Sequence, residues 1–551
     1  MTKRTNLLLG FSSFGIWAVF YQPEIIEAAL ALSFFVIVPI VLSTAVVSLP
    51  NWTGRYSVVF GWCGTLSMNM EARFLPLLLA GIWFFFTLIL GWSGLRRLLA
   101  RGIAPLEETA IDIGYLYLPV GGSWFVLAQG GAASLLPYSS VIVDLTAVHF
   151  HYAAFLLPVF TGLLGRWHYY NEGSNSMGGY QILTVGVLIG PLLTAAAVDQ
   201  GPPLEAVLVG IYVFFLYWLA GWTIKAGLSM PPLAKGSLLL SSAVLIITMT
   251  LSILYSAGRA AGISFIGISG MIPWHGAWNA FIFSIFALIG WYAAFPAPRA
   301  VYNQFPISRL RGRRNIAERF TAKHLPEPGE GLLTVWQNYK REDFSPETLD
   351  RLVAAFYTQT ARFGMEADIT WDVPFLSPVS SFFTNKMKQI NIPSSGPAAM
   401  SGTIYRLPEE RDGRPEPHVW IRQNRSTEEP IFTAVYSRHT KKGVTYFNIA
   451  LPLPAGVMTG ILRPVHGRKG TLILTSRKSL DKRGDEGIYI TIGGWTWKTP
   501  LQEVFHVWEA GGGLEASHSL MVGPLRFLTI KYRLPLIGEP KHAGVERFSG
   551  E

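Results

Sequence analysis

The chain has 551 residues, of which 50% are hydrophobic and only 15% are charged. This composition, with a mean hydropathy of +0.33, excludes an ordinary soluble protein of this length. The formal net charge of +10 comes without a recognisable nucleic-acid-binding motif, so we expect no nucleic-acid partner. The single cysteine, Cys63, excludes an internal disulfide and any metal site with several cysteine ligands.

The charged residues divide the chain into two parts. Up to about residue 298 they are sparse and separated by long apolar runs, whereas from SRLRGRRNIAERF (308–320) onward the composition is typical of a globular domain. We therefore predict four regions: a multi-span transmembrane domain over 1–298, a basic juxtamembrane segment and linker over 299–331, a cytoplasmic α+β domain over 332–540 and a flexible tail over 541–551.

The transmembrane part contains eight good candidate spans, since a helix needs roughly 20 mostly apolar residues to cross the hydrocarbon layer. These spans are 6–22, 25–48, 74–95, 142–165, 180–199, 204–223, 237–256 and 274–295. Segment 55–70 is short, and segment 110–128 contains Asp, Pro and paired Gly, which packed spans tolerate. The expected fold is a polytopic α-helical membrane bundle of about eight to ten spans, followed by a soluble α+β domain with an antiparallel sheet.

Basic residues indicate the orientation of the spans. With ten spans, most of them fall on one side, namely Lys3, Arg4, Arg96, Arg97, Arg101, Arg166, Lys225, Lys235 and the arginines at 309–314. This side should be the cytoplasm, so the C-terminal domain is expected there in a bacterial cell membrane. The start, MTKR followed later by AALALS, also resembles a cleaved signal peptide, but the apolar stretch continues for another span, which favours retention.

The stretch LTAVHFHYAAFLLPVFTGLLGR (145–166) places His149 and His151 in the outer half of a span. Residues two apart on a helix point to nearly opposite sides, so these histidines cannot readily bind one metal ion from an unbroken helix. Asp144 lies two turns from His151 on nearly the same face, and Thr146 is close enough to His149 for contact. Ionisable groups within spans often mark functional sites; interhelical hydrogen bonding and headgroup contact are the alternatives.

The last span begins in MIPWHGAWNAFIFSIFALIGW (271–291), where Asn279 follows His275 by one helical turn. A helix that enters from outside places both residues in the same outer layer as His149. We therefore predict an intramembrane polar site where His275, Asn279 and either His149 or His151 converge, with the three histidines as candidate metal ligands. For His275 the alternative is an interfacial position, which also suits Trp and His.

Other polar or small residues of the membrane part have structural interpretations. Glu108 and Asp112 lie on one face at the start of a span, where they would either relay protons or stabilise the helix dipole, and the structural role is favoured. Arg166, with the aromatic residues that follow it, is typical of an interfacial anchor. Gly258 and Gly262 are compatible with close helix packing.

The two histidine-containing stretches, together with LYLPVGGSW (116–124), resemble the YndJ-like family of bacterial multi-pass membrane proteins over about 75–295. The resemblance implies that the family's two motifs fall on His149, His151 and Tyr152, and on His275, Gly276, Asn279 and Ala280. It implies no catalytic role or cofactor, because no biochemical function is established for the family. Trp274 departs from the basic or polar residue expected there, which weakens the case for a charged site.

The C-terminal half begins with a linker, PEPGEG (326–331), and an amphipathic helix over 345–364, capped by Ser345 and stopped by Gly364. A second helix is predicted over 377–390. From about residue 398, short alternating segments separated by turn signals predict an antiparallel sheet with the two helices packed on it. Such a sheet commonly forms a hydrophobic pocket or a binding face.

Five polar residues of this sheet are candidates for a role beyond the surface, although solvent-facing positions or cross-strand pairing are favoured: Arg422, Glu503, His506, Glu515 and His518. In an extended strand His506 points away from Glu503, so EVFH is not a metal-binding pair. Walker, Rossmann, HExxH and GxSxG motifs are absent from usable positions. The sequence therefore indicates no enzyme class.

Three functions remain open from the sequence. The first is a sensor or transporter-like bundle whose outer-half histidines bind a ligand, metal ion or proton, with a cytoplasmic domain that responds. The second is a membrane-embedded enzyme or binding protein for a lipid or other apolar substrate. The third is a scaffold whose polar residues only hold helices together. In each case the lipid bilayer is the expected partner, while cofactors and oligomeric state stay open.

Overall fold

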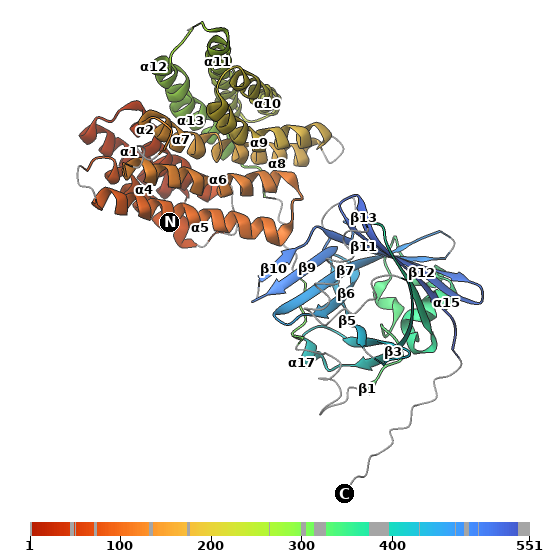
Figure 1. The fold of residues 1–551 in the computed structure, drawn as a ribbon. Helices are drawn as coiled ribbons and strands as arrows, with labels where there is room; N and C mark the ends of the chain where they lie inside the picture. The colour runs from red at the N-terminus through yellow and green to blue at the C-terminus, as the bar shows by residue number, and fades with distance from the viewer. Residues whose placement is uncertain are drawn as a thin grey trace. The chain divides into compact units, whose positions relative to one another are not determined.

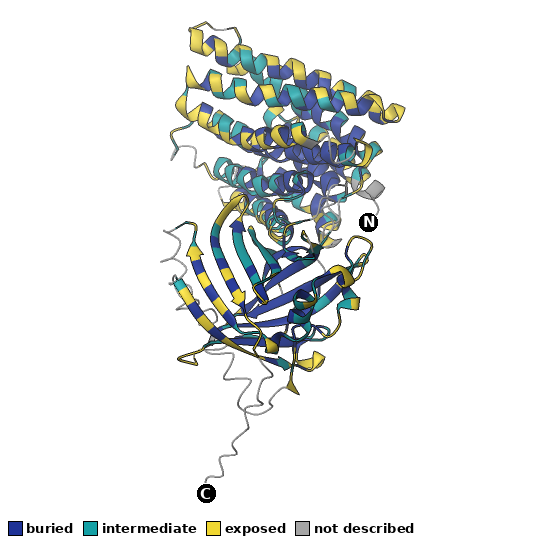
Figure 2. Cartoon of the chain, turned by 90° about the vertical axis from the view of Figure 1, so that its right-hand side faces the viewer, coloured by how far each residue is buried: buried dark blue, intermediate teal, exposed yellow. Residues whose placement is uncertain are grey.

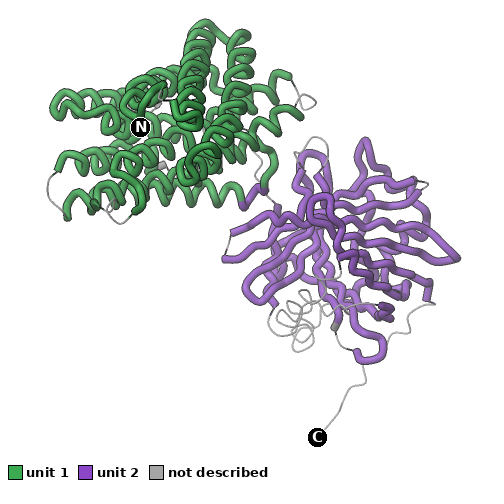
Figure 3. Tube along the Cα trace, turned by 45° about the horizontal axis from the view of Figure 1, so that its top comes forward, with its two compact units in different colours: residues 1–98, 103–300 green, residues 99–102, 301–551 purple. Residues whose placement is uncertain are grey.

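The structure is a computed structural model that describes residues 3–44, 49, 51–70, 74–131, 136–172, 177–263, 265–298, 305–312, 327–373, 396–428, 430–468, 470–478, 484–493 and 495–537. The chain forms two compact units, residues 1–98 with 103–300 and residues 99–102 with 301–551, coloured separately in Figure 3. The first unit is helical and the second consists mainly of β-strands (Figure 1).

Each of the ten predicted spans corresponds to helical structure in the first unit. Eight of the described helical stretches are long and apolar enough to cross a membrane, while the apolar part of α1 is shorter. The elements are α1 (Lys3–Tyr21), α2 (Ile25–Leu32), η1 (Ser33–Ile37), α3 (Val38–Thr44), α4 (Asn51–Ser67), α5 (Phe74–Arg101), α6 (Leu106–Gln129), α7 (Ser140–Tyr152), α8 (Leu156–Glu172), α9 (Met177–Gln200), α10 (Leu204–Leu228), α11 (Pro232–Ala261), α12 (Ile268–Met271), η4 (Ile272–Phe283) and α13 (Ser284–Ala294).

The predicted histidine span is broken into two helices. Helix α7 ends at Tyr152 and α8 begins at Leu156. Pro158 lies in the first turn of α8, where a missing N–H is tolerated, whereas in a continuous helix its ring would clash with the carbonyl of residue 154. The N–H of Ala154 instead bonds to the carbonyl of His149 at 3.0 Å. The break therefore comes directly after the two histidines.

Two stretches are wound as π-helix, η1 with 5 residues and η4 with 12. Such helices are rare and often occur at functional sites. His275 and Asn279 both lie in η4. The predicted last span is thus helical, but its first part is wound more widely than an α-helix.

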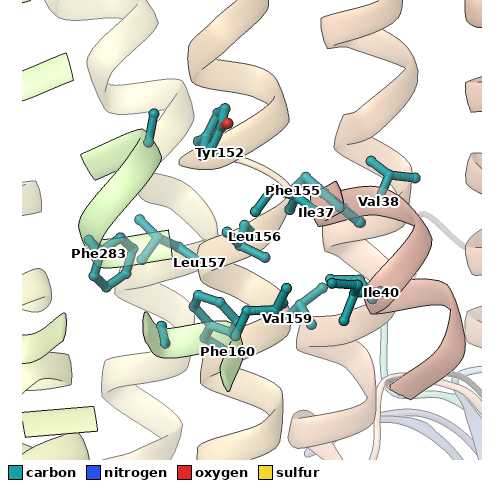
Figure 4. Packing of buried hydrophobic residues seen from close by; sticks show 14 of the residues in the cluster. Ile37, Val38, Ile40, Tyr152, Phe155, Leu156, Leu157, Val159, Phe160 and Phe283 are labelled. Carbon is teal, nitrogen blue, oxygen red and sulfur yellow. The ribbon is translucent and has the colours of Figure 1, made fainter. Parts of the chain in front are cut away.

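The core of the helical unit lies around α2–α3, α7–α8 and the last span. Of the most apolar 18 residues, 83% are buried in Ser140–Glu172 and 78% in Ile25–Ser43. In Leu204–Leu228 the share is only 28%. Figure 4 shows side chains of the α7–α8 segment, among them Leu157 and Phe160, packed between Phe283 and the segment that carries Ile37 and Ile40. Exposed residues follow the outermost helices in Figure 2. The histidine span is therefore central rather than peripheral.

Gly258 and Gly262 end helix α11 instead of packing helices together. Gly262 is the C-cap with φ 69°, a left-handed conformation that favours glycine. The N–H of Ile263 returns to the carbonyl of Gly258 at 2.8 Å, as in a Schellman motif. A Cβ on Gly258 would lie 2.5 Å from the carbonyl oxygen of Ile263, so the prediction of helix packing at these glycines was wrong.

The second unit contains the predicted antiparallel sheet. Its strands are β1 (Glu327–Pro328), β2 (Met365–Trp371), β3 (Gly396–Arg406), β4 (His418–Asn424), β5 (Pro430–Lys441), β6 (Val444–Pro452), β7 (Gly456–His466), β8 (Leu472–Thr475), β9 (Gly487–Ile492), β10 (Trp495–Lys498), β11 (Leu501–Ala510), β12 (Gly513–Val522) and β13 (Leu525–Leu534). Every pairing is antiparallel, and β1 pairs only with β3.

The sheet closes into a barrel. Its strand order is β10-β9-β7-β6-β5-β4-β3-β2-β13-β12-β11-β8, and β8 also pairs with β7. The strands from β7 round to β8 therefore form a ring, with β9 and β10 as a side branch (Figure 1). Closure pairs strand edges that would otherwise be exposed. The sheet is thus completed by its own strands and not by the helices.

The helix predicted over 345–364 is shorter than expected. Helix α15 covers Arg351–Thr358, flanked by 3-10 turns at Pro346–Thr348 and Thr360–Arg362, and its N-cap is Asp350 instead of Ser345. The apolar face of α15 packs with the inward-facing residues of the barrel through Val353, Phe356 and Tyr357. The second predicted helix at 377–390 and the tail at 541–551 lie outside the described residues.

Part of the predicted linker packs on the outer surface of the barrel. Ile307 and Leu310 contact the cluster that contains Val419 and Ile421, and the Ser308 hydroxyl donates to Asp412 Oδ1 at 2.5 Å. Asp412 lies at the end of the short helix α17 (Glu409–Asp412) and is also paired with the fully buried Arg414. Residues 305–312 thus form part of the β unit.

Candidate functional site

Strand periodicity decides which polar residues face the inside of the barrel. In β4, Trp420 belongs to the interior cluster, whereas Val419 and Ile421 belong to a cluster on the other side. Because alternate residues of a strand share a face, Arg422 points inward with Trp420. By the same rule Glu503 faces inward with Val507 of β11, and His518 with Ala516 of β12.

These three polar residues line one cavity inside the barrel. Its volume is about 140 Å³, and most of its wall is apolar. The apolar lining includes Ile369, Met400, Ile431, Phe432, Ile449, Leu451, Met458, Ile488, Leu501, Phe505, Leu520 and Ile530. The polar lining consists of Arg422, Tyr436, Glu503, His518 and Tyr532. The site thus combines an apolar body with a few polar groups, as small-molecule sites commonly do.

Arg422 is a buried cation on the wall of this cavity. Its relative exposure is 8%, and its guanidinium carbon lies 4.5 Å and 4.2 Å from the ring centroids of Trp420 and Phe432. Its Nε is buried and makes no hydrogen bond, while the Tyr532 side chain supplies a hydrogen-bonding partner elsewhere on the guanidinium. Within the described residues, no carboxylate forms an ion pair with Arg422.

Glu503 and His518 form a pair at the same cavity. His518 Nε2 lies 3.3 Å from Glu503 Oε2, and the imidazole stacks on Phe505 with 3.7 Å between ring centroids. Gly460 on β7 leaves room for the carboxylate, since a Cβ there would lie 2.4 Å from Glu503 Oε1. The acid in this cavity is therefore already engaged by a neighbouring strand.

The two tyrosines of the cavity are neutral hydrogen-bonding groups. Burial raises the pKa of the Tyr436 hydroxyl to about 12, although the nearby Arg422 opposes the shift. Burial also raises the pKa of Tyr532, again against the influence of Arg422. Both hydroxyls therefore keep their protons at neutral pH, and Arg422 supplies the positive charge of this wall.

The remaining two candidates of the sheet lie elsewhere. His506 faces away from Glu503, as predicted, and its Nε2 lies 3.1 Å from the Thr471 hydroxyl. Glu515 alternates with Ala516 and so points away from the interior cluster. Neither residue lines the cavity. The structure thus separates the five sequence candidates into three inside the barrel and two outside.

In the helical unit, His151 is used to pack helices. It is fully buried, its Nδ1 lies 2.8 Å from the Ala147 carbonyl, and its Nε2 lies 3.2 Å from Trp83 Nε1. A carbonyl only accepts and an indole N–H only donates, so the ring must be neutral with its proton on Nδ1. Both nitrogens are therefore occupied, and His151 has no free position for a metal ion.

His149 and His275 differ from His151. His149 is exposed on α7 and donates from Nδ1 to the Leu145 carbonyl at 2.7 Å. His275 donates from Nδ1 to the Thr248 carbonyl at 3.0 Å, with the Ser252 hydroxyl also 3.0 Å away. Neither ring has another hydrogen bond within the described residues, so each Nε2 is open.

Asn279 belongs to the same polar layer as His275. Its Oδ1 accepts from the Thr248 hydroxyl at 3.0 Å, and its Nδ2 donates to the His275 carbonyl at 2.8 Å. The structure therefore brings His275 and Asn279 together on one face against α11, with His151 bonded elsewhere. No group of three or more His, Cys, Asp or Glu with metal-binding geometry occurs among the described residues.

The other predicted members of this layer have separate contacts. The Tyr152 hydroxyl donates to the Ala29 carbonyl at 2.7 Å and ties α7 to α2. Asp144 is half-buried on α7. The expected contact between Thr146 and His149 is replaced by a bond from the Thr146 hydroxyl to the carbonyl of residue 142 at 2.6 Å.

Glu108 and Asp112 belong to a buried ion-pair network that joins three helices. Arg166 of α8 donates from Nε and Nη2 to the two carboxylate oxygens of Glu108, each at 2.7 Å. Arg97 of α5 donates to Glu108 at 3.1 Å and lies 3.2 Å from Asp112. Arg166 is fully buried, so its prediction as an interfacial anchor was wrong. The two arginines and two acids balance in charge.

Sequence reasoning missed Tyr436, Tyr532 and the pairing role of Arg97. Tyr436 and Tyr532 lie two residues after Ala434 and Ile530, so each pair shares the inner face of its strand. Strand period was therefore an available signal. The sequence indicated Arg97 only as a marker of the orientation of the spans in the membrane. It lies eleven residues before its partner Glu108. Its pairing depends on the turn between α5 and α6, which the sequence does not specify.

Comparison with known proteins identifies the family. The YndJ-like protein family model matches residues 28–283, which starts earlier than the region suggested by the motifs. The chain is 36% identical over 474 residues to the "Uncharacterized membrane protein YndJ" of Bacillus subtilis (strain 168), covering 83% of this chain and 84% of that protein. No solved structure matches. This chain is therefore a membrane protein of the YndJ-like family.

Proposed function

We propose that the protein is a membrane-bound receptor whose C-terminal barrel binds a small, mainly apolar ligand. The observation that carries this proposal is the cavity of about 140 Å³ with a mostly apolar wall inside a closed barrel. A protein cavity of roughly 150 Å³ with an apolar wall can bind benzene. The expected ligand therefore has an apolar body about the size of an aromatic ring or a short acyl chain.

Ligand titration of the full-length protein tests this function. Hexanol and benzyl alcohol would be titrated by calorimetry into protein held in phosphatidylcholine nanodiscs, with empty nanodiscs as the background. Ile449→Trp should abolish binding, because the larger side chain would fill the cavity from β6. The matched control is Glu515→Gln, which lies outside the cavity and should bind like the wild type. Equal heats for wild type and Ile449→Trp would contradict the proposal.

We also propose that the barrel faces the cytoplasm. Support comes from Arg96 and Arg101 near the end of α5 and from Lys225 in the last turn of α10, since basic residues accumulate on the cytoplasmic side. A reporter fused after residue 320 should be active only in its cytoplasmic form. Activity of a periplasm-dependent reporter at that position would reverse the orientation.

A second candidate function is cation or proton binding by His149 and His275. It is favoured by their hydrogen bonds, because a metal-binding histidine commonly donates its other ring N–H to a backbone carbonyl and both residues do so. His149→Ala and His275→Ala should each remove metal that copurifies with untagged protein, measured by mass spectrometry. His506→Ala should retain the metal. Unchanged metal content in both intramembrane variants would rule out a metal role.

A further inference from the structure

We propose that the ligand of the barrel is a monoanion, a carboxylate on a small apolar body, with its charged group held by Arg422. This inference depends on the proposed ligand-binding function and specifies the chemical class of the ligand. The residues that carry it are Arg422, its ring neighbours Trp420 and Phe432, and the Glu503–His518 pair.

Arg422 is a buried cation in the wall of an apolar cavity. A charged group that is removed from water is strongly destabilising unless it is paired and hydrogen-bonded. Arg422 is more than nine-tenths buried, yet no carboxylate pairs with it within the described residues. The rings of Trp420 and Phe432 stabilise the cation, but they accept no conventional hydrogen bond from its Nε, which has no partner.

The guanidinium of Arg422 matches a carboxylate in shape and charge. Arginine presents a planar set of N–H donors that fits a carboxylate in a bidentate arrangement, and such charge-assisted bonds are about twice as strong as neutral ones. Arg422 lines the cavity, so a ligand in the cavity reaches it without passing through the barrel wall. An anionic ligand would therefore supply the missing partner.

The other polar groups of the cavity limit the negative charge of the ligand to one. Glu503 lines the same cavity and is paired with His518 at 3.3 Å. The tyrosines of this wall are neutral, because burial raises their pKa. Among the described residues that line the cavity, Arg422 is the only arginine or lysine, so a second negative charge on the ligand would meet no further Arg or Lys and would be repelled by Glu503. A monoanionic carboxylate therefore fits better than a phosphate dianion.

The test compares ligands that share an apolar body and differ in charge. Hexanoate and hexanol, and benzoate and benzyl alcohol, would be titrated into the full-length protein in zwitterionic nanodiscs. In the wild type each carboxylate should bind about tenfold or more tightly than its alcohol, as expected for a charge-assisted hydrogen bond. Phenyl phosphate should bind more weakly than benzoate. Equal affinities within both pairs would overturn the inference.

Variants separate charge recognition from the cavity itself. Arg422→Met should weaken the binding of the carboxylates about tenfold and change the affinity for the alcohols by less than about threefold. Arg422→Lys should keep part of the preference for carboxylates over alcohols. Glu503→Gln should not weaken carboxylate binding. If Arg422→Met fails to fold, the Arg422→Lys and Glu503→Gln data still decide the question. Alcohol binding without a carboxylate preference would refute the inference alone, whereas no binding of either class would refute the proposed function as well.

Discussion

Replacing Arg166 with methionine should destabilise the helical unit by about 3 to 5 kcal/mol, since removing one partner of a buried ion pair leaves an uncompensated charge. Arg166 makes two bonds of 2.7 Å to Glu108 and is fully buried. In its absence Glu108 would lose both of these bonds and keep its pairing with Arg97, which also contacts Asp112. The measurement is thermal unfolding of the purified protein in detergent, together with the yield of folded protein.

The double variant Arg166→Met/Glu108→Gln is the matched control for this prediction. It removes one charge of each sign, so Arg97 stays paired with Asp112. The double variant should therefore recover much of the stability that Arg166→Met loses. If the single variant is as stable as the wild type, the buried ion pair does not hold α6 and α8 together. If the double variant is no better than the single one, the loss comes from packing instead of charge.

Replacing His151 with alanine should destabilise the protein by about 2 to 4 kcal/mol, because it creates a cavity and leaves a buried N–H unpaired. The N–H in question belongs to Trp83, which lies 3.2 Å from His151 Nε2 and is itself fully buried. Phe34 also packs edge-on against the imidazole at 5.3 Å between ring centroids. Thermal unfolding measures the effect.

His149→Ala on the same helix provides the comparison. His149 is exposed and bonds only within its own helix, so its replacement should change stability by less than about 1 kcal/mol. If His149→Ala lowers the stability as much as His151→Ala does, then His151 is not the one histidine of the two that packs the helices together. The pair thus distinguishes two residues that the sequence presents as equivalent.

Much of the membrane part was predictable because helix formation and apolar composition depend on residues that are close together in the sequence. Helix length and apolar composition located the spans, and the angle between residues two apart on a helix correctly separated His149 from His151. The break after Tyr152 was not anticipated, although Pro158 carried the signal. For the π-helix that holds His275 and Asn279, the sequence reasoning had no equivalent signal.

The candidate site in the barrel was harder to predict than the helices. Strand period placed Glu503 and His506 on opposite faces, as observed, but it does not reveal which strands meet across a barrel. The closure of β8 onto β7 joins segments that are adjacent in sequence, whereas Arg422 and Glu503 come from strands far apart in the chain. Their shared cavity depends on long-range pairing, which no local pattern encodes.

The two halves of the chain carry different kinds of polar residue. In the helical unit, Arg166 and His151 satisfy the hydrogen bonds of their neighbours and hold helices together. In the barrel, Arg422 lines a largely apolar cavity, and no carboxylate among the described residues forms an ion pair with it. A cation that is buried without an acidic partner is the stronger indication of a ligand site, because its free energy is lowered when an anion binds.

The most direct measurement is an experimental structure of the full-length protein bound to 4-bromobenzoate. The proposed function and its ligand class together predict the bromine atom inside the barrel cavity near Ile449 and Met458, and the carboxylate within about 3 Å of the Arg422 guanidinium, the usual hydrogen-bond distance. Bromine located only outside the barrel, or an empty cavity at saturating ligand, would contradict the proposal that the barrel is a ligand-binding site.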